Sequence, residues 1–212
     1  MANSAISSLR VVDHHVAGRP RPDDVARIQA PLTSTLTAEL DGAHDYLGVP
    51  ADEILLAAIT RTIARTIGDC DLAIDVKADG EFTAVLPCMS TRSADATEAL
   101  RAVHHRVATA RHPVDSQMTA PADVFVWFMR TAPEPVARDV LPAHETLPSA
   151  GHALEVRIYR VAGLAQMDWW YDTRRLDRST VEELTEQFPL ALIDLTSDAA
   201  PPVHEPVNLA MA

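Results

Sequence analysis

Residues 37–66 read TAELDGAHDYLGVPADEILLAAITRTIART, two helical patterns separated by a short break. In the first pattern, apolar residues recur every three or four positions up to Leu47, and Gly48 and Pro50 end the helix. The second pattern predicts a helix over residues 51–67, with Gly68 as its C-terminal cap. Its apolar face is wide, which is typical of a helix that is largely buried in a globular core.

The rest of the chain alternates between strand and helix patterns. Strands are predicted over 72–76, 82–86, 124–129, 153–161 and 164–171, and a helix over 95–110. A last helix begins with Ser179 as the expected cap and Glu182 three residues later. This order predicts an α/β fold with a mixed sheet of four or five strands covered by helices.

The domain organisation follows from where these patterns begin and end. Residues 1–27 are predicted to form an N-terminal extension or an edge strand, because they contain prolines and no sustained period. Residues 28–197 form one lobe, and residues 198–212, which hold three prolines, are predicted to be a disordered tail.

Composition excludes several classes of function. The formal net charge of −12 disfavours binding to a phosphate backbone, so no nucleic-acid partner is expected. No apolar run approaches the roughly 18 residues of a membrane span, and no secretory signal is seen, so we expect a cytoplasmic protein. Cys70 and Cys88 form no CxxC pair, and the 7 glycines form no phosphate loop. Neither a metal site nor a cofactor is therefore expected.

Several segments, taken in order, carry a family pattern. They are Leu55-Leu56-Ala57-Ala58 in the second helix, EFTAVLP over residues 81–87, the strand at 123–128, the hairpin turning at Gly163, and Trp169-Trp170-Tyr171. This series resembles the C-terminal lobe of nonribosomal-peptide-synthetase condensation domains, in the chloramphenicol-acetyltransferase-like superfamily. The resemblance implies a single lobe of the chloramphenicol-acetyltransferase-like fold.

The chain also departs from that family. Condensation domains have two similar lobes, and the lobe that carries the HHxxxDG motif has no counterpart here. The Gly-Arg that follows the first strand in the family is replaced by Ala78-Asp79-Gly80-Glu81. The asparagine of the family's FNY strand is replaced by Val126 or Trp127. The resemblance therefore implies a lobe without the family's own catalytic histidine.

His14 and His15, in DHHVAGRP, are the nearest approach to that motif. An HHxxxDG motif would require Asp and Gly at positions 19 and 20, where the sequence has Arg19 and Pro20. No catalytic residue is therefore assigned, and His15 remains a weak candidate. His104 and His105 are adjacent helical residues that point about 100° apart, so they cannot share one ligand.

Aromatic residues cluster in two predicted strands. Strand alternation places Trp169 and Tyr171 on one face and Trp170 on the other. Core packing explains at least half of the aromatic residues. We expect Trp127, Trp169 and Tyr171 to contact a substrate or a partner.

Two functions remain open. The first is a free-standing interaction or assembly protein in peptide- or polyketide-type secondary metabolism, which pairs with a second lobe or with itself as a homodimer. The second is an acyltransferase or cyclase that acts on an acyl or aminoacyl intermediate, with a carrier protein as a further partner. In that case His15 is the candidate to supply the histidine.

Overall fold

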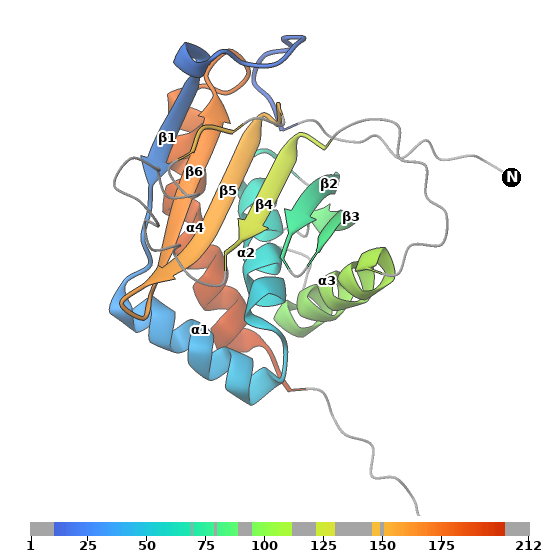
Figure 1. Ribbon diagram of the computed structural model, residues 1–212. Coiled ribbons are helices and arrows are strands. Elements are labelled where there is room, and N and C mark those ends of the chain that lie inside the picture. Colours follow the sequence, from blue (N-terminus) through green and yellow to red (C-terminus); the bar gives the residue numbers. More distant parts are fainter. Residues whose placement is uncertain are drawn as a thin grey trace, which may run out of the picture.

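The computed structural model describes residues 11–68, 70–78, 80–88, 95–111, 122–129, 146–148 and 151–201. Within them, four helices cover a six-stranded sheet (Figure 1). The helices are α1 (Ser34–Leu47), α2 (Ala51–Thr66), α3 (Ala96–Arg111) and α4 (Arg178–Asp198). The strands are β1 (Val25–Gln29), β2 (Cys70–Lys77), β3 (Glu81–Cys88), β4 (Val124–Phe128), β5 (Leu154–Val161) and β6 (Leu164–Asp172).

The sheet is mixed, as the sequence predicts. Its strand order is β1-β6-β5-β4-β2-β3; β2, β4 and β5 run parallel, and the other pairs are antiparallel. It has six strands instead of the predicted four or five, because β1 adds an edge strand beside β6. This strand begins at Val25, inside the predicted N-terminal extension, rather than at the apolar residues Val11 and Val12.

The helix boundaries follow local chemistry. The Thr33 side chain accepts a hydrogen bond from the Leu36 amide at 3.2 Å, and Gly48 ends α1 with a φ of 65°. The cap of α4 is Asp177, so the prediction of Ser179 is wrong by two residues. Ser179 lies inside the first turn, and the helix continues through Pro189.

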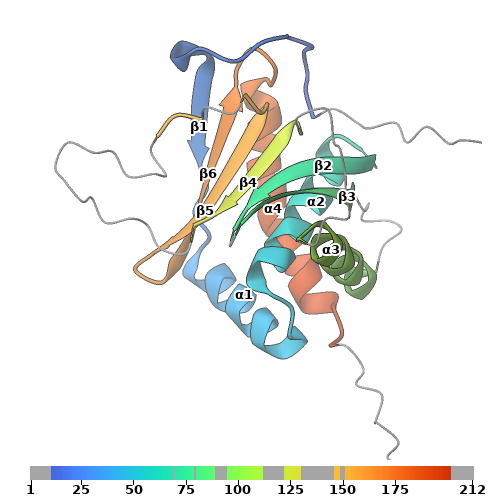
Figure 2. The ribbon, with the colours of Figure 1, turned by 45° about the vertical axis from the view of Figure 1, so that its right-hand side comes forward.

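The helices lie on one side of the sheet, as Figures 1 and 2 show from two directions. Side chains at alternate strand positions point to this side and form the core with α2 and α4. Those buried core residues include Ile74, Val76, Val124, Val126, Leu154, Val156, Met167, Trp169 and Tyr171. No described helix covers the opposite side of the sheet.

Two searches concern only the described residues. None of the described helices has the length and apolar character needed to cross a membrane. Within the same ranges, no group of three histidine, cysteine or acidic side chains is placed to hold a metal ion. Most of the predicted tail, from residue 202 onward, lies outside the described residues.

Candidate functional site on the polar face of the sheet

The side of the sheet without helices carries polar and aromatic residues, which we call the polar face. Strand register arranges them in two rows that cross the whole sheet. The first row, from β1 to β3, is Arg27, Trp170, Glu155, Phe125, Asp75 and Thr83. The second row, in the same order, is Gln29, Asp168, Arg157, Trp127, Lys77 and Glu81. None of the twelve side chains is aliphatic, in contrast to the core side of the same strands.

Cations and indole rings alternate across the polar face. The Arg27 guanidinium lies 5.0 Å from the ring centre of Trp170, and Arg157 lies 5.0 Å from the same ring. Arg157 also lies 5.6 Å from the Trp127 ring, which Lys77 approaches at 4.6 Å. These distances fall within the range of cation–π attraction, so five strands are linked by one chain of contacts.

Carboxylates balance these cations. Glu155, which is 4% exposed, accepts a hydrogen bond from Arg157 Nε at 2.6 Å. Asp168, which is 1% exposed, accepts hydrogen bonds from Gln29 at 3.2 Å and from the Tyr159 hydroxyl at 3.0 Å. Buried charges persist in proteins only when they are paired and hydrogen-bonded. The polar face is therefore a paired network with specific geometry rather than a solvated surface.

One corner of the polar face holds a histidine–aspartate pair. His152 Nε2 lies 2.8 Å from Asp75 Oδ2, and the Thr83 hydroxyl donates to the other carboxylate oxygen. The imidazole is stacked on Phe125, with ring centres 5.1 Å apart and planes inclined by 17°. Burial opposes ionisation of Asp75, but the hydrogen bonds from His152 and Thr83 lower its pKa below the ordinary value. Asp75 is therefore a persistent carboxylate.

The second ring nitrogen of His152 has no partner. The Nδ1 atom is buried and meets no hydrogen-bonding group within the described part of the chain. An acceptor left in this state costs about 1–3 kcal/mol relative to a satisfied one. Because Asp75 holds Nε2–H, a neutral imidazole presents Nδ1 as a lone pair.

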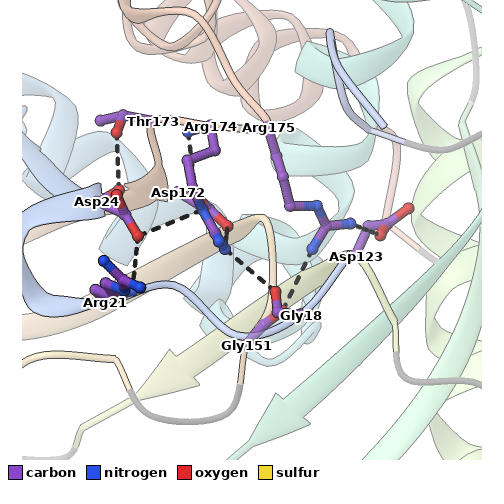
Figure 3. Close-up of polar contacts among 9 residues, drawn as sticks. All are labelled: Gly18, Arg21, Asp24, Asp123, Gly151, Asp172, Thr173, Arg174 and Arg175. Carbon is purple, nitrogen blue, oxygen red and sulfur yellow. Dashed lines mark hydrogen bonds and ion pairs between the residues drawn. The ribbon is translucent and has the colours of Figure 1, made fainter. Parts of the chain in front are cut away.

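A second network fixes the backbone beside this corner (Figure 3). Arg174, directly after β6, donates to both oxygens of Asp172 at 2.9 and 2.8 Å and to the Gly18 carbonyl at 3.2 Å. The adjacent Arg175 pairs with Asp123 and donates to the Gly151 carbonyl at 3.3 Å. The network therefore ties the N-terminal segment, the start of β4 and the turn before β5 together.

Gly151 connects the network to His152. Its φ of 85° is strained for any residue with a side chain, and an added Cβ would lie 3.2 Å from Arg19 Cγ. The Arg175 hydrogen bond to its carbonyl holds the turn that positions the next residue, His152. The position of this imidazole is thus set by backbone conformation as well as by Asp75.

The predicted site residues fall in three different places. His15 is exposed and lies beside Arg175 in a shallow pocket, while its neighbour His14 pairs with Asp177 at 3.1 Å. Trp169 and Tyr171 are 1% and 4% exposed and lie in the core beneath the helices. Of the predicted residues, only Trp127 reaches the polar face, where it is half-buried. The contact roles of all four residues stay predictions.

Sequence reasoning missed the residues that form this corner. The alternation of β2 places Asp75 and Lys77 on one face, a signal that is present in the strand pattern. The same alternation places Trp170 on the opposite face from Trp169, and the structure agrees. His152 carries no such signal, because it precedes β5 and reaches Asp75 only through the fold.

The fold is that of one lobe of condensation-type domains, with the chloramphenicol-acetyltransferase-like arrangement. The epimerization domain from the third module of tyrocidine synthetase B superposes with a TM-score of 0.71 at 12% identity, covering 92% of this chain and 53% of that one. The condensation domain for chain release from the enacyloxin polyketide synthase gives a TM-score of 0.59 at 12% identity, over 88% of this chain and 44% of that one.

At the level of sequence, the chain is similar to part of a polyketide synthase. It is 31% identical over 247 aligned residues to one subunit of the phenolphthiocerol/phthiocerol polyketide synthase of Mycobacterium tuberculosis, and equally to the corresponding protein of Mycobacterium bovis. The alignment covers 95% of this chain but only 17% of the relative's length. No protein-family model matches the chain.

Proposed function

We propose that this chain is a condensation-type lobe that serves polyketide or peptide assembly in the cytoplasm by pairing with a second lobe of the same fold. The observation that carries this proposal is the polar face, which crosses all six strands and is covered by no described helix. Its aromatic and arginine content is characteristic of the centres of protein interfaces. The coverage of about half of each structural neighbour supports a two-lobe arrangement.

A second copy of the chain is the simplest partner. Twofold symmetry places the same patch of each copy against the other, so a self-complementary surface is required. The polar face has both cations and carboxylates in registered rows, which allows opposite charges to meet across such an axis. Trp127 is half-buried in one of these rows, beside Lys77, which is 41% exposed.

The test is the mass of the purified chain by light scattering coupled to size exclusion. We expect a particle near twice 23.0 kDa, and Trp127→Glu should return the monomer. The matched control is Tyr46→Glu on α1, because Tyr46 is 67% exposed and lies outside the polar face. A monomer at all concentrations contradicts self-pairing, and an equal effect of both variants contradicts the assignment of the surface.

The second candidate function is an acyltransferase or cyclase that acts on an acyl or aminoacyl intermediate held by a carrier protein. The observation that favours it is the orientation of His152 by Asp75, since a general base needs an imidazole positioned by a third group. Thiol release from an acyl-N-acetylcysteamine thioester tests it. His152→Ala should abolish any release; loss with His15→Ala instead would return the role to His15.

A further inference from the structure

A small cavity opens on the polar face where β2, β3 and β4 meet. It has a volume of about 290 Å³. Its polar lining consists of Asp75, Glu81, Thr83 and His152, and its aromatic wall includes Phe125. A volume of this order accommodates a small organic molecule. The cavity has no role in the packing of one lobe on another, so its lining requires a separate explanation.

The charges of the lining are negative. Asp75 and Glu81 are both carboxylates, and no lysine or arginine stands among the described residues of the lining. Asp75 remains ionised because His152 and Thr83 donate to it, and its side chain is still 25% exposed. Lys77 approaches Glu81 at 3.3 Å, but its ammonium lies over the Trp127 ring, outside the cavity. An anion is therefore disfavoured here, and a cation is favoured.

The hydrogen-bonding groups of the lining are acceptors. The Thr83 hydroxyl hydrogen is used on Asp75, so its oxygen can only accept. The His152 side chain is 8% exposed, lines the cavity and has an Nδ1 that lacks a donor within the described residues. This unpartnered acceptor is independent of the two carboxylates, and it requires the same kind of ligand group.

From these observations we propose that the cavity between β2, β3 and β4 binds a small molecule that carries a primary ammonium group. An ammonium supplies three donors and one positive charge, which match the acceptors and the two carboxylates of the lining. The Phe125 ring adds an apolar and cation–π contact for the carbon next to the ammonium. His152 is the positioning residue, since it holds both the Asp75 carboxylate and the Phe125 ring in place.

The experiment titrates the full chain with 2-phenylethylamine, 2-phenylethanol and 3-phenylpropanoate and follows the His152 imidazole and Phe125 ring signals by NMR. These probes share an aromatic ring and differ in the polar group. We expect saturable shifts with the amine, at least 10-fold weaker binding of the alcohol, and no binding of the carboxylate. Equal binding of the three probes, or no saturable shift with the amine, would overturn the proposal.

Variants locate the site. Asp75→Asn should weaken amine binding at least 10-fold, while Asp71→Asn, the same change on the same face of β2 but outside the cavity lining, should leave it within 2-fold. Glu81 is 74% exposed, so Glu81→Gln folds normally and keeps the test decisive if Asp75→Asn does not fold. Glu81→Gln should weaken amine binding about 3-fold. Unchanged affinity in folded Asp75→Asn, or in Glu81→Gln, contradicts the proposed site.

Discussion

The two faces of one sheet differ in how they are stabilised. On the helix side, residues such as Val156 and Trp169 are buried among aliphatic neighbours, and the Trp169 ring meets Phe188 of α4 edge-on at 5.9 Å. On the polar face, Arg157 and Glu155 are as deeply buried, yet they are held by hydrogen bonds, ion pairs and ring contacts. One strand, β5, contributes alternate residues to both environments.

This difference separates folding from recognition. Burial of apolar area on the helix side is non-directional and contributes most of the stability of the lobe. Ion pairs at low exposure contribute little net stability compared with apolar residues of similar volume, but they fix geometry. We therefore expect substitutions on the helix side to change unfolding free energy, and substitutions at the exposed part of the polar face to change binding.

The largest effect is expected for Trp169→Ala. Removing a ring that is 1% exposed leaves a cavity beneath α4, so the free energy of unfolding should fall by about 4 kcal/mol. Urea unfolding followed by circular dichroism measures the change. Trp169→Phe, which keeps most of the volume, should lose less than half as much. A loss below about 1 kcal/mol for the alanine variant would contradict the assignment of Trp169 to the core.

A comparable loss is expected on the polar face when one member of the buried ion pair is removed. Arg157→Met leaves Glu155 charged and buried, which should cost about 3 kcal/mol in the same urea assay. The double variant Glu155→Leu with Arg157→Met removes both charges and should recover most of the loss. Additive losses would mean that the two charges do not depend on each other.

Acid should act on the polar face more than on the helix side, through Asp172. Burial opposes ionisation of Asp172, but the hydrogen bonds from Arg174 lower its pKa below the usual aspartate value. The resulting stability is present above the ordinary pKa of about 3.9 and is lost as pH falls through the lower folded value. Asp172→Asn should cost about 2 kcal/mol at pH 7 and progressively less below pH 4.

Urea unfolding at a series of pH values checks this prediction. The control is Asp45→Asn, because Asp45 is an exposed carboxylate on α1. The control variant should follow the wild-type pH dependence throughout. A loss for Asp172→Asn that stays constant from pH 7 to pH 3 would contradict the role of the ionised carboxylate.

The smallest change in stability is expected for Trp127→Ala. The ring is half-buried and contacts Lys77 and Arg157, and such contacts contribute about 0.5–1 kcal/mol each. Unfolding free energy should therefore fall by about 1 kcal/mol, while the mass in solution returns to that of a monomer. A stability loss equal to that of Trp169→Ala would remove the distinction between the two faces.

The helices and strands were predictable because their signals are local. The apolar period of residues 37–66 and the caps at Thr33 and Gly48 need no information from the rest of the chain. The predicted burial of β4 on both sides was wrong, since Phe125 and Trp127 are half-buried on the polar face. An apolar run cannot distinguish a strand between two layers from one at a polar surface that uses aromatic rings.

The site was less predictable than the fold because it depends on register. Trp127 and Arg157 are neighbours only because β4 and β5 pair in parallel with one particular offset. A shift by one residue would place Arg157 in the core. The unpartnered nitrogen of His152 depends further on a turn at Gly151 that the Arg175 side chain holds. Neither relation is present in the order of residues alone.

The pairing of β1 with β6 has a consequence for synthesis on the ribosome. Val25 lies opposite Asp172, so an edge strand made early must wait for a partner made near the end of these residues. At about 5–20 residues per second, that wait lasts roughly 10 s. During this time β1 presents an unpaired backbone that can recruit other strands. We expect the nascent chain to need protection by a chaperone until β6 has left the exit tunnel.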